Sequence, residues 1–225
     1  PQMPSPPFQM RNISTQSPEL ALALQRGLNK GGMKSCGKHF PGHGFVEGDS
    51  HLTLPQDDRS LAELQAADML PFKQLSSAGM AAVMPAHVVY SKVDSLPAGF
   101  SAKWLKQILR QDIGFNGVIF SDDLTMEGAV SAGGIRERSK LAFEAGCDIV
   151  LVCNRPDLVD ELREGFVMPE NPALAGRWQY MANTLSTDEA AAMMQTAEFQ
   201  AAQQLTAELA TPKDVAGGVK VGEQF

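Results

Sequence analysis

Three of the four histidines in this chain of 225 residues lie in one short stretch, "GKHFPGHGFVEGDSHLTLP", as His39, His43 and His51. Within that stretch, the tripeptide "DSH" places Asp49 two residues before His51. At that spacing the carboxylate can bind one nitrogen of the imidazole ring and leave the other free for proton transfer. The alternative is a solvated turn capped by Asp49, which is the commoner meaning of an isolated Asp-x-His.

The same stretch is also a candidate metal site, because His39, His43, His51 and Asp49 are all acceptable zinc ligands. His39 and His43 have the i, i+4 spacing of a helical pair, but the proline and glycine between them disfavour a helix. The motif HExxH also needs a glutamate directly after its first histidine, where this sequence has phenylalanine. The sequence therefore predicts no metal and no cofactor, and a metal-dependent hydrolase is the less favoured alternative.

Two adjacent carboxylates end a predicted buried strand in "GVIFSDDLTMEG". Because side chains alternate along a strand, Asp122 and Asp123 are expected to point in different directions, one into a site and the other into the next loop or a helix N-terminus. We assign the chemical role to Asp122, which is nearer the rigid part of the strand. The alternative is that both carboxylates only cap the next turn.

Four segments share a pattern typical of parallel strands, an apolar run that follows glycine and ends in polar residues. They are "GGMKSCGKH", "AGMAAVMPAH", "GFNGVIFSDD" and "AGCDIVLVCNR". Such runs are expected to be buried on both faces of a sheet. Their carboxyl ends carry Lys38, His39, His87, Asp122 and Arg155, at the edge where parallel α/β folds bind ligands.

Helical patterns lie between these strands. Ser17 is the expected N-cap of "PELALALQRGLNK", and Ser60 with Glu63 forms a capping box before "LAELQAADML". Pro71 is expected to interrupt the helix that follows, and Ser101 to cap "AKWLKQILRQDIG". "IRERSKLAFEAG", "PDLVDELREGF" and a long terminal helix complete the series. This alternation predicts an α/β fold with a parallel sheet, either open and doubly wound or part of a barrel.

Composition and charge exclude several classes of protein. The formal net charge of -7, with lysines and arginines scattered singly, leaves no basic stripe for nucleic acid. No apolar run reaches the roughly 18 residues of a membrane span, so no membrane association is expected. Cys36, Cys147 and Cys153 are odd in number and lie in apolar runs, so we expect small core residues in a cytoplasmic protein.

Taken together, "KHFPGHG", "DSH", "VMPAHVVY" and "GVIFSDDLTMEGA" resemble the family 3 glycoside hydrolases, most closely the bacterial β-N-acetylhexosaminidases that recycle peptidoglycan in the cytoplasm. The likeness begins near Pro18 and follows the family's order of motifs. It implies a TIM-type (β/α)8 barrel of which this chain supplies only about the C-terminal half. Residues 1–17 are then expected to be irregular or non-native, and residues 18–225 to be the C-terminal part of the barrel with a terminal helix.

The resemblance also implies an activity, the retaining hydrolysis of terminal non-reducing β-linked N-acetylglucosamine. The implied substrates are N-acetylglucosaminyl-anhydromuramyl saccharides or peptides. Asp122 would be the nucleophile, and His51 the general acid and then base, oriented by Asp49. Lys38 and His39 would bind hydroxyl groups of the sugar. An imidazole with a reference pKa of about 6.5 suits a group that must give and then take a proton near neutral pH.

The sequence departs from the family in its first part, where residues 1–17 also lack the Arg-Ser-Phe type of sequence expected before the first helix. The family carries an earlier segment with an acidic residue and arginines that hold the sugar, and this chain shows no counterpart. A catalytically impaired sugar-binding fragment is therefore the alternative function. Phosphorolysis also stays open beside hydrolysis, because a neutral histidine repels phosphate less than a carboxylate does.

Overall fold

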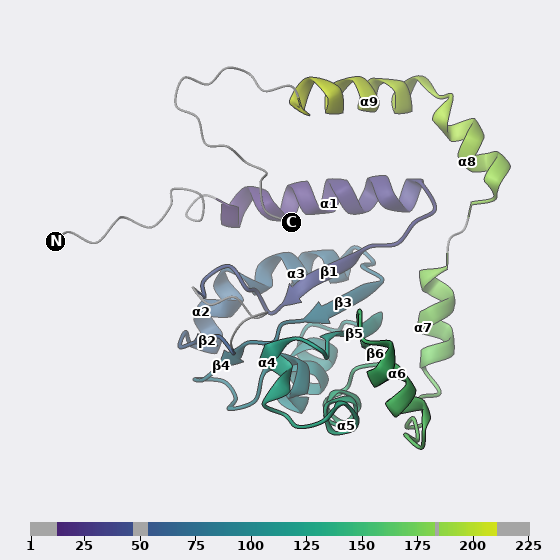
Figure 1. Ribbon diagram of the computed structural model, residues 1–225. Coiled ribbons are helices and arrows are strands. Elements are labelled where there is room, and N and C mark those ends of the chain that lie inside the picture. Colours follow the sequence, from purple (N-terminus) through teal and green to yellow (C-terminus); the bar gives the residue numbers. More distant parts are fainter. Residues whose placement is uncertain (1–12, 47–53, 183–184, 211–225) are drawn as a thin grey trace. The chain divides into compact units, whose positions relative to one another are not determined.

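The computed structural model describes residues 13–46, 54–182 and 185–210 (Figure 1). The chain divides into two compact units, Pro1–Asn183 and Thr184–Phe225. The first contains all the strands of the described residues, and the second contains the helices α8 (Thr187–Met194) and α9 (Ala197–Ala210). The candidate site residues all belong to the first unit.

A parallel sheet organises the first unit. Its strands, in spatial order, are β1 (Cys36–Phe40), β3 (Ala82–Pro85), β5 (Val118–Asp123) and β6 (Ile149–Leu151). The four predicted strands and their parallel pairing are confirmed. The expected burial on both faces holds for most of β3 and β5, but β1 and β6 are partly exposed because each has a neighbour in this sheet on one side only.

Helices connect these strands in the segments that the sequence predicts to be helical, whereas the short helices at 98–100, 127–130 and 174–181 were not predicted. In chain order they are α1 (Ile13–Lys30), α2 (Leu61–Ala66), α3 (Met69–Ser77), the 3-10 turn η1 (Ala98–Phe100), the π-helix η2 (Lys103–Asp112), α4 (Glu127–Val130), α5 (Ile135–Ala145), α6 (Pro156–Arg163) and α7 (Leu174–Met181). A second, two-stranded parallel sheet pairs β2 (Gln56–Asp57) with β4 (Val89–Tyr90). The α/β class is thus confirmed, whereas membership in one half of a closed barrel stays a prediction.

The predicted caps form where side chains can reach free backbone N–H groups. The Ser60 hydroxyl accepts from Glu63 N, and the Glu63 carboxylate accepts from Ser60 N at 2.7 Å, which completes the capping box of α2. Ser101 Oγ accepts from Trp104 N at 3.1 Å. Pro71 lies in the first turn of α3 instead of in the middle of a longer helix. That position needs no N–H donor, so the break falls before the proline.

Two helix boundaries differ from the sequence prediction. Helix α1 begins at Ile13, so Ser17 is inside the helix and Pro18 follows it there. Proline fits helical φ and loses one backbone hydrogen bond, which the flanking turns can compensate. The terminal segment forms two helices instead of one. Thr196 Oγ1 accepts from Phe199 N at 3.2 Å and so starts a new helix there.

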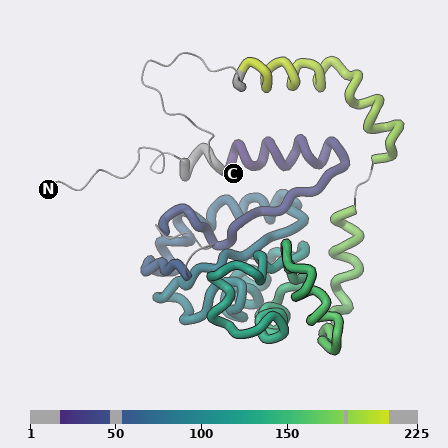
Figure 2. Tube along the Cα trace, viewed as in Figure 1, coloured from purple at the N-terminus to yellow at the C-terminus, as the bar shows by residue number. Residues whose placement is uncertain are grey.

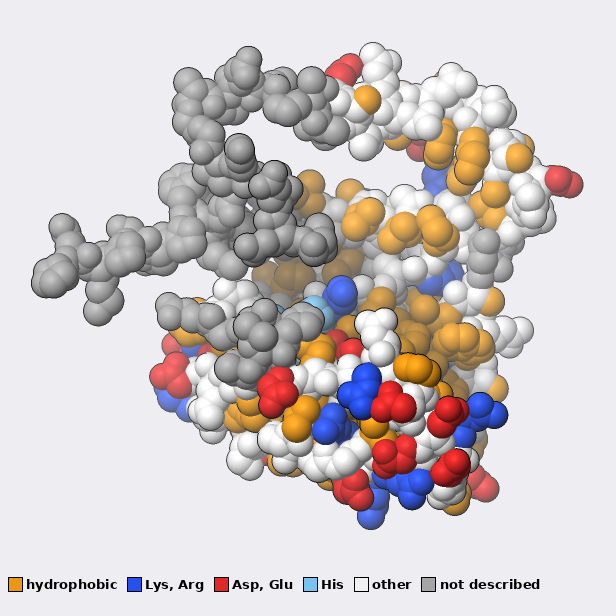
Figure 3. Space-filling view, in the orientation of Figure 1, with side chains coloured by type: hydrophobic (Ala, Val, Ile, Leu, Met, Phe, Trp, Pro, Cys, Tyr) orange, Lys and Arg blue, Asp and Glu red, His pale blue; other side chains and the backbone are white. Residues whose placement is uncertain are grey.

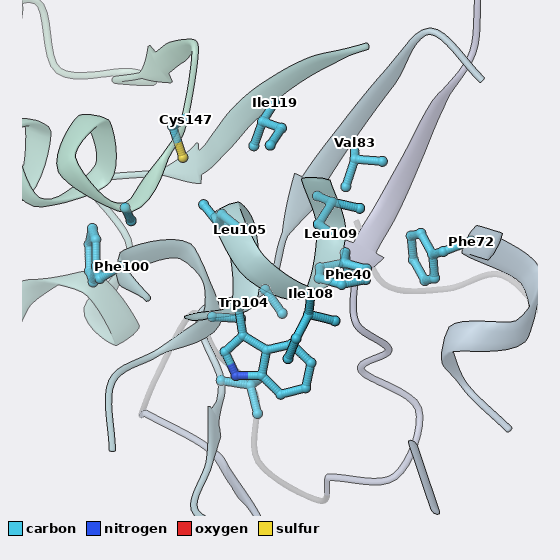
Figure 4. Close-up of a cluster of buried hydrophobic side chains, with 14 of the residues drawn as sticks. Phe40, Phe72, Val83, Phe100, Trp104, Leu105, Ile108, Leu109, Ile119 and Cys147 are labelled. Carbon is cyan, nitrogen blue, oxygen red and sulfur yellow. The ribbon is translucent and has the colours of Figure 1, made fainter. Parts of the chain in front are cut away.

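The core of the first unit lies between the sheet and η2 (Figure 4). Trp104 is fully buried and its ring meets Phe40 and Tyr90 at centroid distances of 5.9 and 5.1 Å. Leu105, Ile108 and Leu109 lie beside it, as the predicted apolar face of this helix requires. Burial of these side chains fixes the position of β1 and β3, whose carboxyl ends carry histidines.

Helix α7 packs against the amino ends of the strands. The chain reaches it from β6 through α6 (Figure 2). Asp148, directly before β6, accepts from Arg177 and Asn171 on one carboxylate oxygen and from Arg110 and Ile119 N on the other, at 2.7 to 2.8 Å. This cluster joins α7 and η2 to the sheet, far along each strand from the candidate site.

The three cysteines are free thiols, and only one is the core residue that the apolar runs predicted. Cys147 is buried, but Cys36 and Cys153 are exposed. Cys36 begins the edge strand β1 and Cys153 follows the end of β6, so neither is covered on both sides. Of the helices in the described residues, none combines the length and apolar character that a bilayer span requires.

A first prediction concerns Gly117, which lets β5 approach β3. A Cβ there would overlap the carbonyl of Ala81, the acceptor of the Val118 N–H at 2.9 Å. We expect Gly117→Ala to lower the free energy of unfolding by about 1–3 kcal/mol in urea denaturation. Gly27→Ala is the control, because Gly27 lies in α1 with nothing within 4 Å of the added methyl. It should stabilise by up to about 1 kcal/mol, and equal effects of the two substitutions would contradict this account.

Candidate active site

The carboxyl ends of β1, β3 and β5 bring together His39, His87 and Asp122. These strands are neighbours and parallel, so their ends lie at one edge of the sheet. The charge of Asp122 acts on both imidazoles. On the face drawn in Figure 3, a histidine is visible beside a Lys or Arg side chain. Three polar side chains thus lie close together at the edge of the sheet where the sequence predicts the site.

Asp122 is largely buried, with 11% of its side chain exposed. Its Oδ1 accepts from Asp123 N at 2.8 Å, which orients the carboxylate. Its Oδ2 lies 3.7 Å from His39 Nε2, a distance too long for a hydrogen bond. Among the described residues, Asp122 Oδ2 therefore has no hydrogen-bond donor in contact.

Asp123 points the other way and holds the following loop. Its carboxylate accepts from Thr125 N and Oγ1 and from Cys153 N, at 2.9, 2.8 and 3.1 Å. Burial acts to raise the pKa of Asp123, but the hydrogen bonds from Thr125 and Cys153 outweigh it and lower the pKa below its ordinary value of 3.8. The different orientations expected of the two carboxylates are confirmed.

His39 is half-buried and stays neutral near neutral pH. Burial lowers its pKa below 6.5 and outweighs the opposite effect of the Asp122 carboxylate; Lys38 and His43 act in the same direction as burial. The His39 and His43 rings meet edge to face at a centroid distance of 6.1 Å. A neutral imidazole next to Asp122 can donate or accept a hydrogen bond without neutralising the carboxylate.

Two other residues at the strand ends lie apart from Asp122. Lys38 is exposed on β1 and lines a cavity of about 470 Å³ between α1, α3 and β1, together with side chains such as Leu24 and Phe72. Its sugar-binding role stays a prediction. Arg155 pairs with Asp157 at 2.6 Å on the surface, an ordinary exposed ion pair.

Asp49 and His51 lie outside the described residues, so the structure tests neither their contacts nor their roles. The described chain on both sides of them is held by one arginine. Arg59 donates to Asp57 and Asp68 at 2.7 and 2.6 Å, and its guanidinium lies 4.2 Å from the centroid of the Phe45 ring. Arg59 thus connects the residues before the loop, the residues after it and the start of α3.

Further contacts fix the beginning of the same loop. The Tyr90 hydroxyl donates to the Gly42 carbonyl at 2.8 Å. Gly42 has a φ of 143° and packs so closely on Asp68 that a Cβ would overlap that side chain. Glycine is therefore required at this position by both backbone conformation and space.

Sequence reasoning did not find the hydrogen bond from His87 or the Arg59 cluster. The sequence prediction gives His87 no catalytic role, and nothing local in the sequence indicates that it contacts Asp123. The closely spaced charges in "QDDRS" were the available signal for Arg59. Within the described ranges, no three His, Cys, Asp or Glu side chains converge in the way that a metal site requires.

The sequence profile described as "Glycosyl hydrolase family 3 N terminal domain" matches residues 14–171 of this chain. The chain belongs to glycoside hydrolase family 3. The resemblance inferred from the motifs is thereby confirmed at the level of the family. The matched range includes every strand described above and all the candidate site residues.

Two curated relatives of this chain are both named "Beta-hexosaminidase". A "Beta-hexosaminidase" of Neisseria meningitidis serogroup C is 76% identical over 206 residues, which cover 92% of this chain and 57% of the relative. A protein of the same name from Chromobacterium violaceum is 53% identical over 204 residues, covering 91% and 57%. The chain thus spans little more than half the length of these relatives.

Solved family 3 structures show the same fold. NagZ from Neisseria gonorrhoeae in complex with N-trifluoroacetyl-D-glucosamine is 71% identical, with a TM-score of 0.80 over 86% of this chain and 56% of that one. The β-N-acetylglucosaminidase from Thermotoga maritima is 29% identical, with a TM-score of 0.66 over 79% and 41%. The same Neisseria gonorrhoeae protein has also been solved in complex with a zinc ion.

A second prediction concerns Arg59. We expect Arg59→Ala to lower the free energy of unfolding by about 3 kcal/mol, because the fully buried Asp57 carboxylate would keep its charge without a cation. Arg163→Ala is the control, since Arg163 is 79% exposed and pairs with Asp160 only at 3.8 Å. Its effect should stay within about 0.5 kcal/mol. Comparable losses in the two variants, measured by urea denaturation, would refute a special role for Arg59.

A third prediction concerns pH. The pKa of Asp123 is lowered in the folded state. The ionised Asp123 carboxylate therefore stabilises the fold fully above about pH 3.8, and this stabilisation is lost as the pH falls through the folded pKa. Asp123→Asn should therefore be less stable than the parent at pH 7, and the gap should narrow below about pH 4. Asp112→Asn, on the exposed side of η2, should follow the parent at every pH. Thermal unfolding at pH 3 to 7 measures both, and a gap independent of pH would be the contrary result.

Proposed function

We propose that the protein containing this chain is a retaining β-N-acetylglucosaminidase that removes terminal non-reducing β-linked N-acetylglucosamine. The observation that carries the proposal is the state of Asp122 in a family 3 fold. Its carboxylate is mostly buried and held by one backbone N–H at the carboxyl edge of the sheet, and Oδ2 accepts no hydrogen bond from the described residues. An anionic group in this state suits nucleophilic attack on an anomeric carbon.

The proposed reaction has two steps. In the first, Asp122 attacks the anomeric carbon, the glycosidic C–O bond breaks, and His51 gives a proton to the leaving oxygen. In the second, His51 takes a proton from water, the hydroxide attacks the anomeric carbon, and the ester to Asp122 breaks. Two inversions return the β-anomer of the sugar. Asp49 would orient His51 and favour its protonated form.

His39 suits a supporting role in this scheme. Because burial keeps its imidazole neutral, it can bind a sugar hydroxyl near Asp122 without forming an ion pair with the nucleophile. Lys38 comes from the same strand, and we assign it to the sugar hydroxyls on the resemblance alone. No metal or cofactor enters the proposed mechanism.

The substrate class rests on the resemblance and on the relatives. The Neisseria gonorrhoeae structure holds an N-acylated glucosamine analogue, which supports a pocket for N-acetylglucosamine. We propose N-acetylglucosaminyl-anhydromuramyl saccharides or peptides as the natural substrates, and peptidoglycan recycling in the cytoplasm as the setting.

A fourth prediction tests the function. The full-length protein should hydrolyse an aryl N-acetyl-β-D-glucosaminide, and Asp122→Asn should lower kcat/KM by about 10³-fold or more, because an amide cannot form the glycosyl ester. Asp112→Asn is the matched control and should keep the parental rate. Proton NMR of the first product should show the β-anomer. An inverted product, or near-parental turnover by Asp122→Asn, would refute the assignment.

Two additions separate the alternatives. Adding inorganic phosphate should leave the rate and product unchanged, whereas a glycosyl phosphate product would indicate phosphorolysis. Calorimetry with N-acetylglucosamine detects binding without turnover, which would indicate an impaired sugar-binding protein.

A further inference from the structure

We propose that His87 is a positioning residue for Asp122, acting through a hydrogen bond from its ring to the main chain of Asp123. The inference rests on the proposed function, because it gives Asp122 the reacting role. It assigns a task to an imidazole that is fully buried and that has no role in the proposed reaction.

The chain that follows β3 brings His87 to the end of β5. β3 and β5 pair Ala82 with Val118 and Val83 with Ile119, and His87 comes two residues after the end of β3, beside Asp123 at the end of β5. His87 Nε2 lies 3.1 Å from the Asp123 carbonyl oxygen. A carbonyl oxygen can only accept, so Nε2 carries the proton and donates. The bond therefore joins the segment after β3 to the last residue of β5.

Asp123 in turn holds Asp122. The Asp123 N–H donates to Asp122 Oδ1 at 2.8 Å, on the opposite side of the Asp123 Cα from the carbonyl that His87 binds. The same carbonyl also accepts from Met126 N at 3.2 Å, so the turn has one support besides His87. The Asp123 carboxylate accepts from Thr125 N, after β5, and from Cys153 N, after β6. Movement of the Asp123 backbone would therefore redirect the Asp122 carboxylate.

Stability alone does not explain an imidazole at this position. His87 is fully buried, and its Nδ1 has no hydrogen-bond partner among the described residues. The ring packs on Phe100 at a centroid distance of 5.5 Å, and a Cβ on Gly99 would lie 3.8 Å from Nδ1. A buried ring nitrogen without a partner is unfavourable, and burial lowers the pKa of His87 so that Nδ1 stays unprotonated. An apolar side chain would satisfy this pocket better than histidine does.

The test compares two amides that differ by one methylene. In His87→Gln the side-chain nitrogen can reach the place of Nε2, whereas in His87→Asn it is too short to reach the Asp123 carbonyl. We expect Asn to lower kcat/KM for an aryl N-acetyl-β-D-glucosaminide about 10- to 100-fold, through misplacement of Asp122, and Gln to restore it to within about 5-fold of the parent. Calorimetric affinity for N-acetylglucosamine should change less than kcat in both variants.

His87→Met separates positioning from stability. It removes the hydrogen-bond donor and fills the pocket with an apolar side chain. The variant should therefore melt at or above the parental temperature, and its kcat/KM should fall as in His87→Asn. If Met does not fold, the Gln and Asn pair still decides. Equal losses in Gln and Asn, or parental kcat/KM in Asn or Met, would overturn the inference.

The outcome can be separated from that of the proposed function. If the parent protein hydrolyses the aryl glucosaminide and Asp122→Asn does not, the proposed function is supported. The role of His87 is then decided by the His87 variants. Parent protein without turnover, or active Asp122→Asn, overturns the proposed function and this inference with it.

Discussion

Close pairing of β3 with β5 is the constraint on which the candidate site depends. Val118 N donates to the Ala81 carbonyl at 2.9 Å, and only a glycine at position 117 leaves room for that approach. The paired segment holds the two strands side by side. Beyond it, His87 Nε2 lies 3.1 Å from the carbonyl oxygen of Asp123, and the N–H of Asp123 orients Asp122. A side chain thus continues the contact between the two strands at their carboxyl ends.

The electrostatic arrangement at that edge keeps one carboxylate available. His39 and His87 both have lowered pKa values because burial disfavours the imidazolium, so neither is a permanent cation beside Asp122. The carboxylate of Asp123 accepts hydrogen bonds from Thr125, in the loop after β5, and from Cys153, which follows β6. Two adjacent aspartates therefore have different partners, because Asp122 accepts only from the N–H of Asp123 among the described residues.

Features set by local chemistry could be predicted from the sequence. The four strands, the capping box at Ser60 and the opposite orientations of Asp122 and Asp123 follow from glycine-bounded apolar runs, capping side chains and the period of a strand. The exposure of Cys36 at the edge of the sheet could not, because it depends on which elements lie alongside. Nor could the contact of Arg59 with Asp68, which depends on where α3 begins.

The buried carboxylates of Asp148 and Asp122 lie at opposite ends of the sheet and differ in how many hydrogen bonds they accept. Asp148, at the amino end, receives four hydrogen bonds, two of them from arginines, and has no capacity left for a ligand. Asp122, at the carboxyl end, receives one from Asp123 among the described residues. Leaving a mostly buried carboxylate with few donors costs free energy, so a purely structural residue would acquire more partners or become apolar. The second oxygen of Asp122 receives no hydrogen bond from the described residues, and under the proposed function a reacting substrate would take that position.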